Sequence, residues 1–186
     1  MKITKTELPG VVVIEPARFG DSRGYFSESW NAARMADGGF DLDFVQDNES
    51  LSAEVGTVRG LHFQSPPHAQ DKLVRVGRGR IMDVAVDIRK GSPHYGQWVG
   101  VELSGENGKQ LLVPKGFLHG FAVLEPDTLV LYKCTDVYAP NCDGSVRFDS
   151  LDIDWGVDVT SAILSGKDEA AIAFADFDSP FIYEDK

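Results

Sequence analysis

Short segments in which apolar and polar side chains alternate recur along this chain. The clearest lies at 80–88, where the sequence reads RIMDVAVDI. One set of alternate positions is entirely apolar: Met82, Val84, Val86 and Ile88. The other set combines apolar side chains with two carboxylates: Ile81, Asp83, Ala85 and Asp87. Because successive side chains of a β-strand point to opposite faces, this pattern predicts a strand.

Further short runs of the same kind are separated by Gly, Pro, Asn or Asp. They lie at 11–14, 25–30, 56–64, 72–76, 97–103, 110–113, 121–124 and 128–134. Many short strands at such spacing are typical of a sandwich, a jelly roll or a barrel. The chain is therefore predicted to be mainly β.

Helical signal is sparse. A short helix is predicted at 31–37, where it would stop at Gly38 and Gly39, and a second at 168–175. No internal repeat and no Gly/Ser linker divides the sequence, so we expect residues 1–186 to form a single domain. The loop-rich C-terminal third is expected to close over one end of the barrel.

Composition narrows the partners and the compartment. The net charge of −11 opposes binding to nucleic acid or to an anionic membrane, and an anionic ligand would need a locally basic pocket. No apolar run is long enough to span a membrane. Cys134 and Cys142 are too few for a disulfide framework, which favours reduced thiols and a cytoplasmic location.

The histidines differ in their surroundings. His62 lies within the predicted strand 56–64, two positions before Gln64, so the two side chains would share a face. His119 follows a Pro and Gly turn that would deliver it to the next strand. His68 and His94 each follow a proline, and we expect them in surface loops. A histidine in a β core is more often structural than catalytic, so position alone does not assign a role.

The spacing of His62 and His119 relative to nearby glycines resembles the two motifs of the cupin superfamily, whose fold is a small β jelly roll. Metal-binding cupins usually place a second histidine and a glutamate in the first motif. Here Gln64 replaces that histidine, and Lys72 lies where the glutamate is expected. A cation there suits an anion better than a metal, so we expect no metal cofactor.

A longer series of motifs resembles one family, the dTDP-4-dehydrorhamnose 3,5-epimerases. In chain order the motifs are FxDxRGxFxE at 19–28, QxN at 46–48, GTxRGLHxQ at 56–64, QxKLV at 70–74, DxAxD at 83–87, VPxGFxHGF at 113–121, IxW at 153–155 and LSxKD at 164–168. Tyr132 and Tyr138 also match. The resemblance covers nearly the whole chain and implies a cupin-type jelly roll with a few short helices.

The family acts on a dTDP-linked 4-keto-6-deoxyhexose without a cofactor. The C4 ketone acidifies the protons on C3 and C5, because their removal gives an enolate. The resemblance implies that His62 is the base and that Asp168 orients it. Lys72, with His119, would stabilise the enolate oxygen, and Tyr132 would return a proton from the opposite face.

The resemblance also implies the binding residues. Arg23, Arg59 and Lys167 match positions that bind the diphosphate, and Tyr138 matches the one that stacks on thymine. Other ligand-contacting positions correspond to Glu28, Gln46, Asn48 and Asp143. Strict alternation would place Arg59 on the face opposite His62, and a bulge at Gly60 would remove that conflict.

Family members form homodimers that exchange N-terminal segments, and a homodimer is therefore expected here. The implied reaction converts dTDP-4-dehydro-6-deoxy-D-glucose into dTDP-4-dehydro-L-rhamnose. Inversion at C3 alone is an alternative, because small displacements of Tyr132 would spare C5. More distant alternatives are a metal-dependent cupin oxygenase or sugar isomerase, and a non-catalytic carbohydrate-binding jelly roll.

Overall fold

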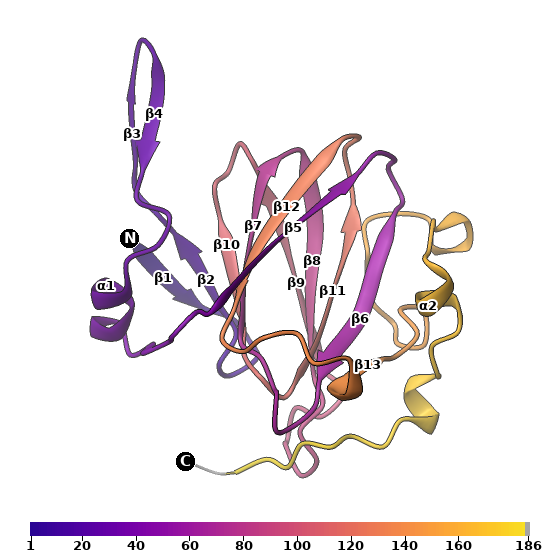
Figure 1. Cartoon of the computed structure of the whole chain (residues 1–186). Helices are drawn as coiled ribbons and strands as arrows, with labels where there is room; N and C mark the ends of the chain where they lie inside the picture. The colour runs from indigo at the N-terminus through magenta and orange to yellow at the C-terminus, as the bar shows by residue number, and fades with distance from the viewer. Residues whose placement is uncertain (185–186) are drawn as a thin grey trace.

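Two antiparallel sheets packed face to face form the body of the molecule (Figure 1). The computed structural model describes residues 1–184. The six-stranded sheet has the order β1 (Lys2–Lys5), β2 (Val12–Glu15), β10 (Gln110–Val113), β7 (Lys72–Arg78), β12 (Thr128–Cys134) and β5 (Gln46–Ser52). The five-stranded sheet has the order β13 (Asp143–Ser145), β6 (Val58–Gln64), β11 (Phe117–Val123), β8 (Arg80–Asp87) and β9 (Trp98–Ser104).

Helices are few and short, as predicted. They are α1 (Ala32–Asp37) and α2 (Gly166–Glu169), with single 3₁₀ turns at Pro140–Cys142, Val159–Ser161 and Phe174–Asp176. The Asn31 side chain caps α1 by accepting a hydrogen bond from the Arg34 amide. The prediction of a mainly β jelly roll is confirmed. Neither α1 nor α2, the helices of the described residues, is long and apolar enough to cross a membrane.

The alternation of β8 determines which of its side chains point between the two sheets and which point outward. Ile81 and Ala85 belong to the buried cluster between the two sheets, together with Val74 and Val130 of the opposite sheet. Val84 belongs to a different cluster, on the outer face of the five-stranded sheet. Both faces of β8 are therefore covered, which explains why its outward positions are as apolar as its inward ones.

The C-terminal segment covers this outer face. Phe148, Ile153 and Trp155 pack there against Val84 and Val86, and the segment runs alongside β6 (Figure 1). The expectation that it closes over one end of the barrel holds only for its last residues, which pair with Lys90 in the loop after β8 and pass below the barrel (Figure 1). An apolar outer sheet face needs a cover along its whole width, and a long segment with little secondary structure supplies it.

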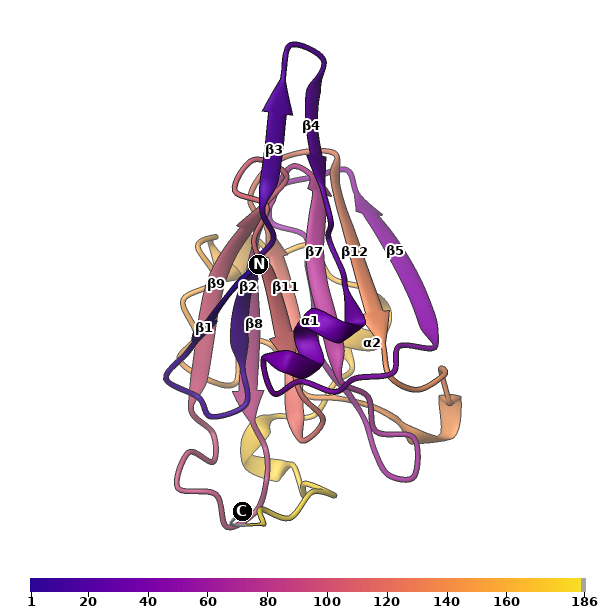
Figure 2. The same ribbon diagram turned by 90° about the vertical axis from the view of Figure 1, so that its left-hand side faces the viewer.

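The outer face of the six-stranded sheet has its own cover, formed by α1 and the chain that follows it (Figure 2). Met35 of α1 is fully buried there beside Leu73 and Leu112, and Trp30 and Phe44 pack around them. The rings of Trp30 and Phe44 pack edge to face, with their centroids 4.7 Å apart.

Several predicted element bounds differ from the structure. The strand expected at 121–124 begins earlier, at Phe117, and the strand expected at 25–30 is β4 (Gly24–Ser27). The helix expected at 168–175 is α2, which ends at Glu169. Four strands were not predicted: β1, β3 (Arg18–Asp21), β5 and β13.

The hairpin β3–β4 projects away from the barrel (Figures 1 and 2). Three of its aromatic side chains are largely exposed: Phe19 by 66%, Tyr25 by 60% and Phe26 by 69%. At its base the Arg18 guanidinium donates hydrogen bonds to backbone carbonyls of the turn after β9. The hairpin thus presents an apolar surface beyond the fold's own core.

Candidate active site

A cavity of about 490 Å³ opens between the two sheets. Its walls combine residues of both sheets with two residues at the start of α2: Glu49, Ser50, Leu51, Arg59, His62, Lys72, His119, Phe121, Tyr132, Ser165 and Asp168. A second cavity of about 360 Å³ shares His62, Lys72 and Tyr132 with the first and extends toward Tyr138. These three side chains therefore lie where the two cavities meet.

His62 is paired with a carboxylate from a distant part of the chain. Its Nε2 lies 2.5 Å from Asp168 Oδ1, across 106 positions of sequence. Ser165 donates a hydrogen bond from its hydroxyl to the other oxygen of Asp168 at 2.8 Å. Burial acts to raise the pKa of Asp168, but the hydrogen bonds from His62 and Ser165 outweigh it and lower that pKa below its ordinary value. Asp168 is thus a carboxylate that fixes the imidazole.

Lys72 and Tyr132 reach the cavity from the sheet opposite His62. Lys72 begins β7 and Tyr132 lies on the neighbouring strand β12, whereas His62 lies on β6. Burial lowers the pKa of Lys72, although nearby acidic groups act against this. Burial also raises the pKa of Tyr132, so its hydroxyl keeps its proton. A proton acceptor and a proton donor therefore face the cavity from different sheets.

His119 has a buried partner that the sequence analysis missed. Its Nε2 lies 2.8 Å from Oδ1 of Asp83, which is inaccessible to solvent. Burial raises the pKa of Asp83, against the opposing effects of His119 and Lys72. The signal was present in the sequence, because Asp83 shares the interior face of β8 with Ile81 and Ala85. A carboxylate at such a position needs a partner.

A bulge at Gly60 brings Arg59 to the same cavity as His62, as predicted. His62 pairs with His119 and Arg59 with Phe121, so three steps along β6 match two along β11. Gly60 has φ +131°, and a Cβ there would lie 2.6 Å from the Gly120 Cα. The close approach of two backbones is possible because both residues lack a side chain.

Five of the predicted nucleotide-binding residues gather around the second cavity, whereas Arg59 lines the first. The five are Gln46, Asn48, Tyr138, Asp143 and Lys167. The Tyr138 hydroxyl donates a hydrogen bond to Asp143 Oδ2 at 3.3 Å, and the Lys167 ammonium is paired with the same carboxylate. The Tyr138 side chain is 57% exposed, so its ring is open to a ligand.

Arg23 and Glu28, also predicted to bind substrate, lie elsewhere in this single chain. Arg23 is in the turn of the projecting hairpin, where it forms an ion pair with Asp21 at 2.5 Å. Glu28 follows β4 and pairs with Arg34 of α1. Neither residue lines the cavities that contain His62.

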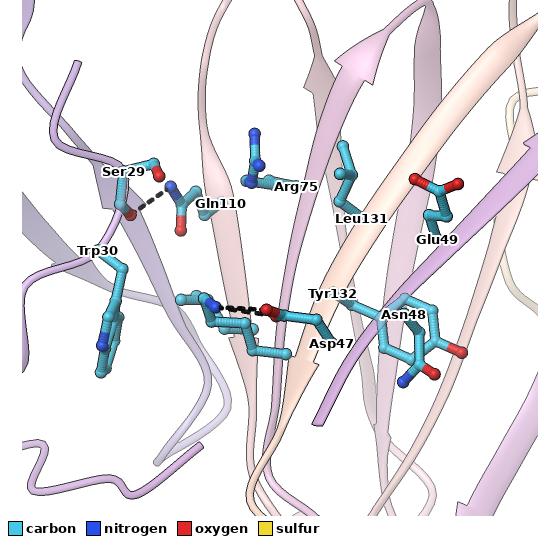
Figure 3. A pocket seen from close by; sticks show the side chains of 11 residues that line it. Ser29, Trp30, Asp47, Asn48, Glu49, Arg75, Gln110, Leu131 and Tyr132 are labelled. Carbon is cyan, nitrogen blue, oxygen red and sulfur yellow. Dashed lines mark hydrogen bonds and ion pairs between the residues drawn. The ribbon is translucent and has the colours of Figure 1, made fainter. Parts of the chain in front are cut away.

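A third cavity, of about 380 Å³, lies on the outer side of β5 and β12 (Figure 3). Asp47, Glu49, Arg75 and Lys133 line it, and Lys133 is paired with Asp47 at 2.8 Å. Gln110 donates a hydrogen bond there to the Ser29 carbonyl at 2.8 Å. Two of its four charged groups, Lys133 and Asp47, are thus paired with each other.

The arrangement of potential metal ligands differs from that of a metal-binding cupin. Within residues 1–184 no group of three or more His, Cys, Asp or Glu side chains could hold a metal ion. His62 and His119 each direct Nε2 at an aspartate instead. His68 and His94 lie in loops, as expected.

Comparison with known proteins assigns the chain to a family. The family model described as dTDP-4-dehydrorhamnose 3,5-epimerase matches residues 5–176. The chain belongs to this family. A dTDP-4-dehydrorhamnose 3,5-epimerase from Sinorhizobium fredii is 49% identical over 175 residues, covering 93% of this chain and 89% of the relative.

Solved structures of this epimerase family share the fold. One is the 3,5-epimerase from Legionella pneumophila, crystallised with dTDP-4-keto-L-rhamnose. It is 46% identical to this chain with a TM-score of 0.94, and the match covers 99% of each chain. A 3'-monoepimerase from Streptomyces bikiniensis, in complex with dTDP-quinovose, is 31% identical with a TM-score of 0.85, and the match covers 92% of this chain and 87% of the other. The barrel is thus common to double and single epimerases.

Proposed function

We propose that the protein inverts C3 and C5 of dTDP-4-dehydro-6-deoxy-D-glucose, giving dTDP-4-dehydro-L-rhamnose. The observation that carries this proposal is the placement of His62 and Tyr132 on opposite sheets around one cavity that also contains Lys72. Inversion at carbon requires a proton to leave from one face and another to arrive at the opposite face. The similarity to the Legionella and Sinorhizobium enzymes supports this choice of substrate.

His62 removes the proton in this mechanism. Its contact with Asp168 fixes the ring and stabilises the imidazolium formed when the proton arrives. Because Asp168 is itself held by Ser165, the geometry of the base is set before substrate binds. The cavity exposes part of the imidazole, so a sugar carbon can approach it.

Lys72 stabilises the enolate. Loss of the carbon-bound proton moves negative charge onto the C4 oxygen, and a buried ammonium interacts with that charge more strongly than one in water does. His119, held by Asp83, lies on the same cavity and supplements it. No cofactor enters this mechanism, because the substrate's own ketone accepts the electrons.

The remaining residues bind the nucleotide. Arg59 and Lys167 are cations at the cavities, and they offset locally the net charge of −11 that would otherwise repel a diphosphate. Tyr138 offers an exposed ring for thymine. Gln46, Asn48 and Asp143 supply polar groups to the same cavity.

The functional unit in this proposal is a homodimer of one-domain chains that exchange N-terminal segments. Its support is the projecting hairpin, whose exposed Phe19 and Phe26 would be covered in such an assembly. Arg23 and Glu28 would then bind substrate in the partner's site rather than in their own. The two free cysteines fit the cytoplasmic location that we propose.

Deuterium exchange tests the proposal directly. The protein would be incubated with the keto-sugar nucleotide in heavy water and followed by NMR, with a downstream reductase to trap the product. Label at both carbons with an L-configured product is expected. Label at C3 alone would instead favour the single inversion suggested by the similarity to the Streptomyces monoepimerase.

Changing Tyr132 to phenylalanine should separate proton removal from inversion. The base is intact in Tyr132→Phe, so deuterium should still enter the substrate, returned by His62 to the face from which the proton left. Formation of inverted sugar is expected to fall about 100-fold, because the donor on the opposite face is missing. The measurement is the ratio of exchanged substrate to inverted product by NMR. An inversion rate equal to that of the wild type would refute this role.

The proposed role of Lys72 predicts an alkaline limit to activity. As the pH rises Lys72 loses its proton and with it the charge that stabilises the enolate. Because burial lowers its pKa, this loss is expected below the ordinary value of a lysine. In Lys72→Arg the cation persists, so kcat should be lower but its alkaline decline should move to higher pH.

The measurement for Lys72 is kcat against pH for both proteins, with circular dichroism at each pH to verify folding. Tyr132→Phe serves as the control, because its remaining activity should keep the wild-type alkaline limit. An identical decline in wild type and Lys72→Arg would contradict the assignment.

A further inference from the structure

The loop that carries Tyr138 is attached to the barrel mainly through its backbone. Tyr138 precedes the 3₁₀ turn Pro140–Cys142, and its side chain is 57% exposed. Its hydroxyl donates a hydrogen bond to Asp143, the first residue of β13. The direction of the ring therefore depends on what fixes the peptide groups around it.

Gln64 fixes the peptide groups on both sides of Tyr138. Its Oε1 accepts a hydrogen bond from the Ala139 amide at 2.9 Å, and its Nε2 donates to the carbonyls of Val137 at 3.0 Å and His68 at 2.5 Å. The Gln64 residue is only 5% exposed. Both hydrogens and one oxygen lone pair of the side-chain amide thus form hydrogen bonds with backbone groups. Because Gln64 is buried, losing any of these bonds would be destabilising.

Two other glutamines bind backbone groups of the same loop. Gln46 on β5 accepts a hydrogen bond from the Tyr138 amide at 2.9 Å, and its own Nε2 donates to Asn48 at 3.1 Å. Gln70 donates to the Asp136 carbonyl at 2.8 Å. Peptide groups of residues 136–139 are therefore bound by side chains from outside the loop.

We propose that Gln64 is a positioning residue for Tyr138, the central member of a glutamine clamp formed with Gln46 and Gln70. The clamp holds the Tyr138 ring in the orientation that receives the nucleobase, so that binding does not have to order the loop. This inference rests on the proposed function for the identity of the ligand. Gln64 acts on binding of the nucleotide and not on proton transfer.

The clamp accounts for the departure from the histidine pattern of metal-binding cupins. A neutral imidazole offers one donor and one acceptor, which could satisfy at most two of the three backbone groups that Gln64 serves. A primary amide satisfies all three. Position 64 in this chain is thus used to hold a loop, although it shares a cavity with His62.

Gln64→Met tests the clamp because it keeps a side chain of similar length and removes every hydrogen bond. We expect the Kd for dTDP, measured by titration calorimetry, to rise about tenfold. The kcat for the keto-sugar should stay within about threefold of wild type while its KM rises in parallel with the Kd. Gln70→Met removes a single bond to the same loop and should raise the Kd by less.

A double-mutant cycle identifies the path of the effect. If Gln64 acts through Tyr138, Gln64→Met should change the Kd for dTDP less than twofold in a Tyr138→Ala background. Thr128→Val is the matched control, since it removes two hydrogen bonds of a buried side chain to backbone near the other end of β12. It should leave the Kd for dTDP unchanged.

Additive effects of the two substitutions would overturn the inference, and so would a fall in kcat at constant Kd. A measurement without ligand distinguishes failure of the clamp from failure of the proposed function. Hydrogen exchange of the Ala139 amide should accelerate in Gln64→Met, and unchanged protection would refute the clamp. A wild-type protein that shows this protection but does not bind dTDP would contradict the proposed function alone.

Discussion

Substitution of His62 by alanine is expected to lower kcat about 10²–10⁴-fold and to stop deuterium uptake at both sugar carbons. In the proposed mechanism the imidazole removes the proton, and Asp168 acts only by orienting that ring. Both quantities would be measured by NMR on the keto-sugar nucleotide in heavy water.

Circular dichroism of His62→Ala should match the wild type, while its Tm should fall modestly, because the buried Asp168 carboxylate loses the hydrogen bond from the imidazole. His94→Ala is the control, since that histidine lies in a loop where it contacts Gln97. It should retain full activity. Near-normal turnover in His62→Ala would remove the base from the mechanism.

Gly60→Ala should produce the largest loss of stability, about 3 kcal/mol or more in the free energy of unfolding. A Cβ at this position would lie 2.6 Å from the Gly120 Cα and 2.9 Å from the His119 carbonyl oxygen, and both are backbone atoms. The positive φ of Gly60 adds strain for any larger residue. Chemical denaturation monitored by tryptophan fluorescence measures the change.

Gly166→Ala provides the comparison for Gly60→Ala. A Cβ there meets no atom within 4 Å, and the residue begins α2, so stability should be equal or slightly higher. A Gly60→Ala protein as stable as the wild type would show that the bulge can relax. In that case the shared cavity of Arg59 and His62 would not depend on this glycine.

Strands with an apolar face were predictable from the sequence, and polar strands were not. The segment 80–88 is apolar on both faces, one in the core and the other under the C-terminal segment, and its alternation comes from Asp83 and Asp87 on the inward face. β5 reads QDNESLS and carries almost no apolar signal. Its Asn48 lines the second cavity and its Asp47 pairs with Lys133, so pairing with β12 defines this strand.

The candidate site was predictable only as far as the family motifs reached. The pairing of His62 with Asp168 was expected from the resemblance, because no local pattern connects residues so far apart. The sequence predicts Asp83 on a strand, but its role as the partner of His119 depends on which strands are neighbours. The clamp around Tyr138 was missed for the same reason, since Gln64 reaches residues more than 70 positions away.

Asp168 lies in the C-terminal segment, whose packing on the sheet involves residues that do not line the cavity, such as Trp155 and Phe148. Trp155 is 1% exposed and its indole nitrogen donates to the Phe148 carbonyl at 3.2 Å. Substitutions among these packing residues would therefore lower kcat by displacing the Asp168 carboxylate, without changing any residue that lines the cavity. A search for faster or slower variants would find tuning positions there that inspection of the cavity alone would overlook.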